Sequence, residues 1–227
     1  MGASEEGVLV RGLFVPRIEA KRFEALADFE GLPNLDVGKV SKCVALCSTF
    51  QTALDIGAHI GAVSVYLARK FQRVIAFEAV PATYEFLRQN TDGLPNVEAL
   101  NIAAGPDEGE VFFSHYQKHG QLSHVASSVE EAGAIRIGPV ARRAIDSLEL
   151  TDISFIKIDV EGYELQVLEG ARETLTRCRP LVLVEQGGNE EKHFGRRRNE
   201  ASEFLESLGM HQHPEAPRMS KDRLYTF

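Results

Sequence analysis

Residues 53–61 read Ala-Leu-Asp-Ile-Gly-Ala-His-Ile-Gly, and the apolar run that follows at 74–77 is closed by Glu78. Two carboxylates, Asp55 and Glu78, therefore stand at the ends of two successive strand candidates, with a glycine turn between them. Gly57 and Gly61 let the chain turn sharply out of a strand and bring backbone N–H groups close to a ligand. This pattern predicts a nucleotide-type site.

The two carboxylates narrow the class of ligand. A carboxylate at the position of Asp55 would repel the phosphates of a dinucleotide, whereas it suits a cationic ligand. Glu78 is placed to accept hydrogen bonds from the two hydroxyls of a ribose. S-adenosylmethionine has both features, and the glycine spacing matches neither the dehydrogenase fingerprint nor a P-loop. The alternative is a glycine turn with a purely structural role.

Other residues of the predicted cofactor site follow from their places beside these strands. His59 lies inside the glycine turn, where it shapes the turn or contacts the amino-acid end of the cofactor. Ile102 and Ala103 follow the third strand and could pack on the adenine ring, or be plain core. The full set of predicted cofactor contacts is Asp55, Gly57, Ala58, His59, Gly61, Glu78, Ala79, Ile102, Ala103 and Asp159.

Composition limits the partners. The chain has 227 residues, 44% of them hydrophobic, and a formal charge of −8, so one large domain with no overall attraction to nucleic acid or an anionic membrane is expected. The basic run 196–198 could contact a phosphate or carboxylate, although a solvated helix start is the more common explanation.

The cysteines and the apolar segments indicate the compartment. Cys43, Cys47 and Cys178 have no C-x-x-C spacing, and their odd number fits a reduced cytosolic protein. We find no signal-peptide core and no stretch near the ~20 apolar residues of a membrane span. The expectation is a soluble, cytoplasmic protein that binds no membrane.

The alternation of short apolar runs with helical stretches predicts the fold. Residues 1–50 are expected to form a helical extension, with amphipathic helices at 18–29 and 37–47. Residues 51–227 are expected to form one α/β domain with a Rossmann-like, mostly parallel, doubly wound sheet, helices on both faces and an antiparallel last strand. Residues 105–140 are expected to be irregular apart from a short strand at 111–113. The seven expected strands are 52–56, 73–78, 96–102, 153–159, 181–185 and a final pair within 209–227, and one helix is expected at 164–176.

Two motifs carry a family resemblance. Residues 53–61 and the segment 156–165, Ile-Lys-Ile-Asp-Val-Glu-Gly-Tyr-Glu-Leu, with Leu168-Glu169-Gly170-Ala171, closely resemble the FkbM family of S-adenosylmethionine-dependent methyltransferases. The similarity runs from about 52 to about 185 and includes the Leu-Asp-like element 145–148. The family commonly has Asn where this chain has His59, and Glu-Pro where Glu78 is followed by Ala79. The resemblance implies an O-methyltransferase for sugars or natural-product scaffolds, with S-adenosylhomocysteine as product.

Asp159 is the first candidate for the base that takes the proton of an acceptor hydroxyl, because it ends an apolar strand next to a glycine-containing turn. The alternative is that Asp159 only contacts the cofactor or holds the loop. His115, His119 and His124 are rival bases in the 105–140 segment, with His124 chosen among them. No metal is predicted; if a divalent ion were bound, its ligands would be Asp159, Glu161 and Glu185.

Two other functions compete with this interpretation. A non-catalytic scaffold or sensor could keep the cofactor pocket, and an N-methyltransferase could share the fold. The turn Asn/Asp-Pro-Pro-Tyr that grips a planar amine is absent after Asp159. The sequence leaves open the identity of the small-molecule acceptor and the oligomeric state, for which a homodimer is one option.

Overall fold

The centre of the molecule is a seven-stranded sheet with the order β14-β15-β13-β12-β5-β6-β7. The structure is a computed structural model that describes residues 6–118, 121–126, 135–187 and 195–227, with the backbone only for 114–118, 121–126 and 135–136. All pairs are parallel except the two that β15 makes, which confirms the predicted Rossmann-like sheet. The strands are β5 (Thr52–Ile56), β6 (Arg73–Phe77), β7 (Val97–Leu100), β12 (Ile153–Ile158), β13 (Leu181–Glu185), β14 (His211–Gln212) and β15 (Asp222–Thr226).

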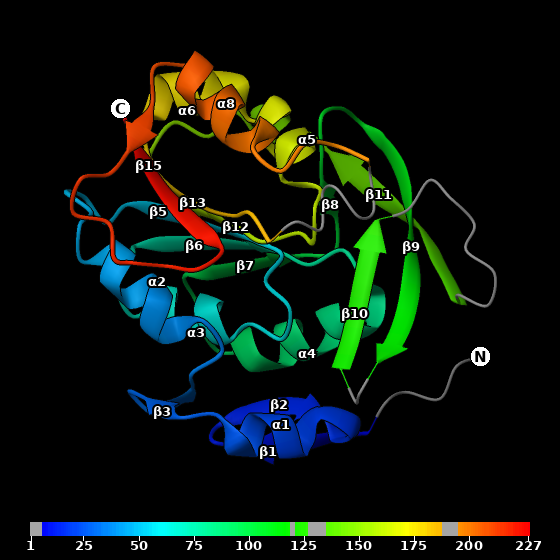
Figure 1. Cartoon of the computed structure of the whole chain (residues 1–227). Helices are drawn as coiled ribbons and strands as arrows, with labels where there is room; N and C mark the ends of the chain where they lie inside the picture. The colour runs from blue at the N-terminus through cyan, green and yellow to red at the C-terminus, as the bar shows by residue number, and fades with distance from the viewer. Residues whose placement is uncertain (1–5, 119–120, 127–134, 188–194) are drawn as a thin grey trace.

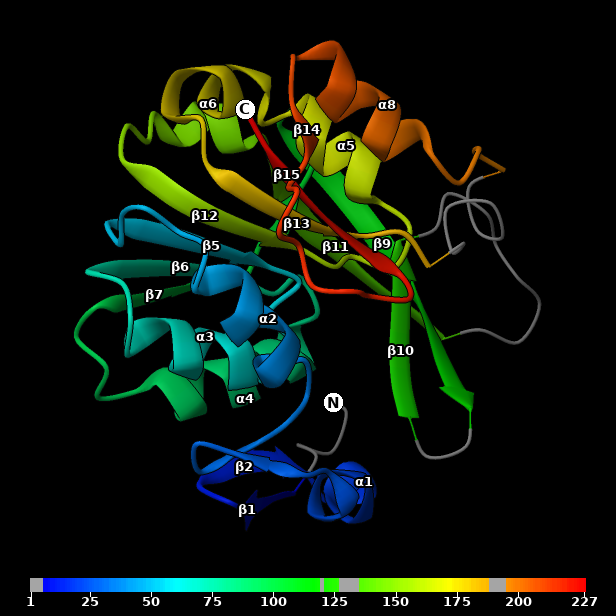
Figure 2. The same ribbon diagram turned by 60° about the vertical axis from the view of Figure 1, so that its left-hand side comes forward.

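Helices cover both faces of this sheet (Figures 1 and 2). One face is covered by α2 (Val37–Val44), α3 (Ala62–Ala68) and α4 (Pro81–Thr91), and the other by α5 (Glu164–Glu169), α6 (Arg172–Cys178) and α8 (Glu200–Ser207). Because β5 and β12 are buried along their whole length, their apolar side chains divide between two hydrophobic clusters, one under each helical layer. This two-sided burial explains why the strands are continuous apolar runs.

The expected helix at 164–176 is divided in two. A Cβ on Gly170 would lie 1.9 Å from the carbonyl oxygen of Gly105, so only glycine permits this close approach of two backbones. Asp146, in the short helix η2 (Ile145–Leu148), then accepts the backbone N–H groups of Glu173 at 3.0 Å and Thr174 at 2.7 Å. The element 145–148 therefore caps the start of α6.

A second sheet occupies the segment that the sequence analysis expects to be irregular. It has the order β10-β9-β11-β8 and lies beside the main sheet (Figure 1). Its strands are β8 (Ala103–Ala104), β9 (Gly109–Lys118), β10 (Gln121–Ala126) and β11 (Ile135–Arg143). The prediction of an irregular segment with one short strand is wrong, because pairing between β9 and β11 gives regular structure to a polar sequence.

The N-terminal segment contains strands as well as helices. Helix α1 (Ala20–Ala25) and helix α2 are shorter than the helices predicted at 18–29 and 37–47. The segment also contains two hairpins that the sequence did not indicate. These are β1 (Gly7–Val10) with β2 (Leu13–Pro16), and β3 (Asp28–Phe29) with β4 (Leu32–Pro33). Leu13 and Phe23 join the same hydrophobic cluster as Leu67 of α3. A domain boundary at residue 50 stays a prediction.

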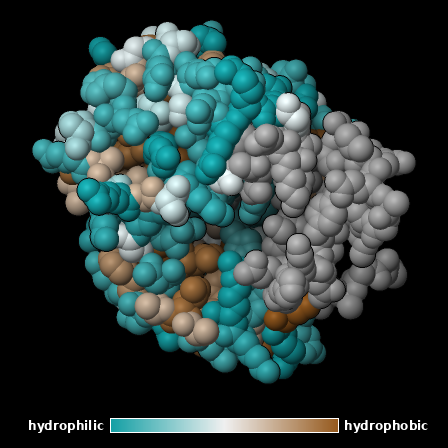
Figure 3. Space-filling view, in the orientation of Figure 1, coloured by the Kyte–Doolittle hydropathy of each residue, from teal (hydrophilic) through white to brown (hydrophobic). Residues whose placement is uncertain are grey.

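The surface shown in Figure 3 is mostly hydrophilic, and its hydrophobic residues gather in the lower half of the view. The large apolar side chains with the greatest exposure are Leu9, Phe14, Ile18 and Phe50, all within the first fifty residues. Across the part of the chain that the structure describes, no helix combines the length and the apolar character needed to traverse a bilayer.

Candidate active site

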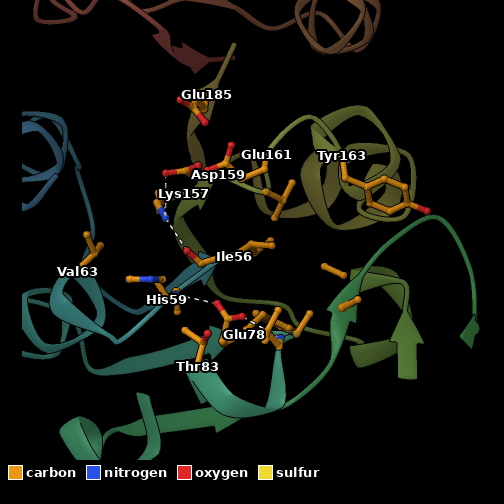
Figure 4. Close-up of a pocket in the computed structure, with 18 of the residues that line it drawn as sticks. Ile56, His59, Val63, Glu78, Thr83, Lys157, Asp159, Glu161, Tyr163 and Glu185 are labelled. Carbon is orange, nitrogen blue, oxygen red and sulfur yellow. Dashed lines mark hydrogen bonds and ion pairs between the residues drawn. The ribbon is translucent and has the colours of Figure 1, made fainter. Parts of the chain in front are cut away.

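A cavity of about 300 Å³ opens at the carboxyl ends of the central parallel strands (Figure 4). It lies where the strand order reverses between β5 and β12, the usual ligand position in such sheets. Its lining, as far as the described residues define it, does not include Asp55 or Gly61. The predicted cofactor contacts that do line it are Gly57, Ala58, His59, Glu78, Ala79, Ile102, Ala103 and Asp159.

The turn after β5 is possible only with its glycine. Gly57 has a φ of +79°, and a Cβ there would lie 1.9 Å from the carbonyl oxygen of Asp159. His59 adopts a φ of +53°, and the turn ends at Gly61, which has a φ of +89° and precedes α3. These left-handed residues bring the backbone of 57–59 to the cavity wall, as the glycine pattern predicts.

Glu78 connects the loop after β5 to the loop after β6 through two hydrogen bonds from backbone N–H groups. Its Oε2 accepts the backbone N–H of His59 at 2.9 Å, and its Oε1 accepts that of Val80 at 2.9 Å. Burial raises the pKa of Glu78 to about 7, against the lowering effect of these two N–H donors. Each carboxylate oxygen has a second lone pair, so Glu78 can still accept hydroxyl donors from the cavity.

Asp55 lies behind the cavity wall and not on it. It is fully buried, its Oδ2 accepts the hydroxyl of Ser64 at 2.6 Å, and its Oδ1 lies 3.4 Å from the ammonium of Lys157. Lys157 also lies 3.7 Å from Oδ2 of Asp159 and donates to the carbonyl of Gly57 at 2.9 Å. The cation thus stands between the two acids, and direct contact of Asp55 with a ligand stays a prediction.

The Asp55–Lys157–Asp159 group carries one net negative charge beside the cavity. Burial lowers the pKa of Lys157, but the charges of Asp55 and Asp159 outweigh burial and raise the pKa above its usual value. The ammonium is therefore retained, and the single excess charge favours a cationic ligand. The side chain of Lys157 is only 6% exposed, so its ammonium is paired inside the protein and does not lie at a solvent-exposed edge of the sheet.

Asp159 and Glu185 form a hydrogen-bonded carboxyl pair at the ends of β12 and β13. Burial and the neighbouring charge of Asp159 raise the pKa of Glu185 to about 9. Burial acts in the same sense on Asp159, yet the ammonium of Lys157 and the hydrogen bond from Glu185 outweigh it and lower the pKa. Near neutral pH the pair accordingly holds one proton between its two carboxyl groups.

The wall opposite Asp159 is apolar. Ile102 and Ala103 line it, together with Val80, Val111 and Phe113, and the last four belong to one hydrophobic cluster. Sequence reasoning missed Val111 and Phe113 as cavity residues, because they belong to β9 and reach the cavity only through the second sheet. Tyr163 and Thr83 were also missed, although both stand within a few residues of motif positions.

Residues of the N-terminal segment complete the cavity. Arg22, Leu35 and Asp36 line it, and the ring of Phe23 stacks on His59 with centroids 6.4 Å apart. Arg22 pairs with the buried Glu19 at 3.0 Å. The first fifty residues therefore supply part of the cavity wall.

The remaining predicted site residues are the candidate histidine bases, which the structure does not test, and the alternative metal ligands. His124 lies opposite His115 on the paired strands β10 and β9, with only the backbone described, and His119 lies outside the described residues. Their role as bases stays a prediction. Within the described ranges, no cluster of three or more His, Cys, Asp or Glu could hold a metal ion, so the alternative with Asp159, Glu161 and Glu185 gains no support.

The basic run 196–198 is explained by the structure itself. Arg196 and Arg197 pair with Glu200 at the start of α8, and Arg197 also pairs with Glu203 at 2.6 Å. Arg198 donates to the carbonyl of Gln186 at 3.3 Å. These contacts support the interpretation of the run as a helix start.

Comparisons with known proteins agree with the geometry. The family model described as "Methyltransferase FkbM domain" matches residues 55–211. Methyltransferase sdnD of Sordaria araneosa is 29% identical over 58% of this chain and 64% of its own length. Hexuronic acid methyltransferase AglP of Haloferax volcanii is 29% identical over 58% of this chain and 54% of its own. The matched region thus spans between half and two thirds of these relatives.

A solved structure, the methyltransferase FkbM from Methylobacillus flagellatus KT, shares the fold with a TM-score of 0.51 and 19% identity, over 79% of this chain and 44% of that one. The match to the family model covers more than half of the chain, and it includes residues 55–61 of the first motif and all of the second. The chain belongs to the FkbM family of S-adenosylmethionine-dependent methyltransferases.

Proposed function

We propose that this protein transfers the methyl group of S-adenosylmethionine to a hydroxyl of a small molecule, such as a sugar or a natural-product scaffold. The observation that carries this proposal is the composition of the cavity at the strand ends, in which Glu78, an apolar wall and the Asp55–Lys157–Asp159 charges surround a space of about 300 Å³. The names of sdnD and AglP support a small-molecule acceptor.

The residues present fit the cofactor. Glu78 would accept the ribose hydroxyls, Ile102 and Ala103 would pack on the adenine, and the backbone of 57–59 would face the amino-acid end. The excess negative charge of the Asp55–Lys157–Asp159 group suits the sulfonium and ammonium cations. When bound, S-adenosylmethionine supplies an electrophilic methyl group. A cytoplasmic location belongs to the same proposal.

Asp159 is the residue proposed to act on the acceptor. Its carboxylate is 24% exposed at the cavity and keeps its charge because of Lys157, so it can accept the proton of a hydroxyl. Glu185 holds Asp159 by donating its own proton. The protein's main task is to align the hydroxyl oxygen with the methyl group and exclude water, which contributes about 7 to 11 kcal/mol in well-oriented reactions.

Calorimetry with S-adenosylmethionine tests the proposal directly. We expect binding by the wild-type protein and binding at least about tenfold weaker in Glu78→Ala, because hydrogen bonds to a charged group are lost. Glu85→Gln, on the exposed side of α4, is the matched control and should bind as the wild type does. Acceptors are then sought by mass spectrometry of methylated products. Absence of binding to the wild type would overturn the proposal.

Cofactor affinity is expected to rise about tenfold between about pH 6 and pH 8, since Glu78 must lose its proton to accept both ribose hydroxyls. The sign follows from the pKa of about 7 in the free protein, which the hydroxyl donors would lower in the complex. The dissociation constant at several pH values measures this. Glu78→Gln cannot ionise and should give a weaker, flat profile; a flat wild-type profile would contradict the contact.

A further inference from the structure

A second buried carboxylate, Glu164, ties down the loop on the other side of the cavity. Its Oε1 accepts the backbone N–H of Val160 at 3.2 Å and that of Gly162 at 3.1 Å. The side chain also accepts its own backbone N–H, and the residue is 4% exposed. Glu164 is not among the described residues that line the cavity beside Asp159, and the two N–H groups that it accepts both belong to the loop.

The loop that Glu164 holds has an unusual backbone. Glu161 adopts a φ of +56° and Gly162 a φ of +104°, so two successive residues lie in the left-handed half of the map. For a residue with a Cβ such as Glu161, this conformation costs about 1 to 2 kcal/mol and persists only when its surroundings impose it. The two N–H groups that Glu164 accepts stand on either side of Glu161.

The consequence of this conformation is the direction of Glu161. Its side chain lines the cavity beside Asp159 and Glu185, as Figure 4 shows. If residue 161 adopted an extended or right-handed conformation, its side chain would point in another direction. The loop would move with it, and so would the carbonyl group of Asp159 that lies next to Gly57. The position of the acceptor side of the cavity therefore depends on the 160–162 turn.

We propose that Glu164 is a positioning residue, which holds the 160–162 turn in its left-handed form so that Glu161 faces the acceptor in the cavity. The part of this inference that concerns the acceptor rests on the proposed function. The part that concerns the turn rests only on the hydrogen bonds that Glu164 accepts. Glu78 likewise accepts two backbone N–H groups, although those of His59 and Val80 belong to two different loops.

The hold does not depend on the ionisation of Glu164. Burial raises its pKa to about 7, and a neutral carboxyl group still offers a carbonyl oxygen to the two N–H donors. Glutamine offers the same oxygen, whereas alanine offers none. Glu164→Gln and Glu164→Ala therefore separate the positioning contact from the charge.

Hydrogen exchange of the backbone amides, measured by mass spectrometry on the full chain, tests the hold without any acceptor. In Glu164→Ala we expect exchange at 160–162 to be at least about tenfold faster, with the central strands β5 and β12 unchanged. Glu164→Gln should keep the wild-type rate. Glu169→Ala, an exposed glutamate of the same helix, is the control and should change nothing. Unchanged exchange in Glu164→Ala would overturn the proposal.

Steady-state kinetics with an acceptor found by mass spectrometry test whether the turn positions Glu161 toward the acceptor. Glu164→Ala should raise the KM for the acceptor about tenfold and leave the dissociation constant of S-adenosylmethionine within about twofold, and Glu164→Gln should restore the wild-type KM. An equal loss in both variants would overturn the positioning role. If the wild type binds no S-adenosylmethionine, the proposed function fails, while the exchange measurement still decides whether Glu164 holds the turn.

Discussion

Gly57→Ala is expected to lower the free energy of unfolding by about 2 to 5 kcal/mol and to abolish cofactor binding. Two costs combine at this position. The φ of +79° is unfavourable for any residue with a Cβ, and the new Cβ would lie 1.9 Å from the carbonyl oxygen of Asp159. Because that oxygen belongs to the backbone between β12 and the 160–162 turn, the clash is relieved only if two central loops separate.

The matched control is Gly93→Ala. Gly93 has nearly the same φ, +83°, but a Cβ there would meet no described atom within 4 Å. For Gly93→Ala only the conformational cost remains, which lowers the free energy of unfolding by about 1 to 2 kcal/mol. Gly93 is not among the described residues that line the cavity. Urea unfolding of the three proteins measures the difference. Equal losses in the two variants would show that the contact with Asp159 is unimportant.

The four central strands β5, β6, β12 and β13 are predictable because they are buried on both faces. Such strands are short, continuous apolar runs, and each is followed by a helix with its own turn residues, as at Pro81 of α4. The second sheet has neither signal. Strands β9 and β11 pair across more than twenty residues of sequence, and few of their described side chains, such as Val111 and Val140, are buried. Pairing between distant polar segments leaves no local periodicity to recognise.

The same burial explains what sequence reasoning could not decide about the site. The ends of β5, β6, β12 and β13 meet at one edge of the sheet, and this brings Glu78, Asp159 and Glu185 to the lining of one cavity. A strand buried on both faces has no polar alternation, and therefore the sequence does not indicate which face Asp55 and Lys157 occupy. Lys157 lies between Asp55 and Asp159, and direct contact of Asp55 with a ligand stays a prediction.

Glycines of the second motif show a related limit. Gly162 and Gly170 are quoted in the family resemblance, and a helix running to residue 176 is the natural prediction from periodicity. Gly170 instead allows contact with the carbonyl of Gly105, more than sixty residues away, and the helix is divided there. A close approach between distant backbones can be recognised only in three dimensions.

Lys157→Met is expected to be the most destabilising single change at the site, lowering the free energy of unfolding by about 3 to 5 kcal/mol, because it leaves buried acids without their cation. Lys157 lies 3.4 Å from Asp55 and 3.7 Å from Asp159, and its ammonium also donates to the carbonyl of Gly57 at 2.9 Å. Lys42→Met, at an exposed position of α2, is the control and should change stability by less than about 0.5 kcal/mol.

A double-mutant cycle identifies the cause of this loss. In Asp55→Asn with Lys157→Met, one of the two uncompensated carboxylates is removed, so the double variant should be more stable than Lys157→Met alone by about 1 kcal/mol or more. Asp55 is the acid to neutralise because it is fully buried, whereas Asp159 has some exposure and the proton of Glu185 beside it. Additive losses, measured by urea unfolding, would mean that Lys157 acts through packing and its bond to Gly57. A non-additive result would establish that the cation is retained to hold the charge of Asp55 behind the cavity.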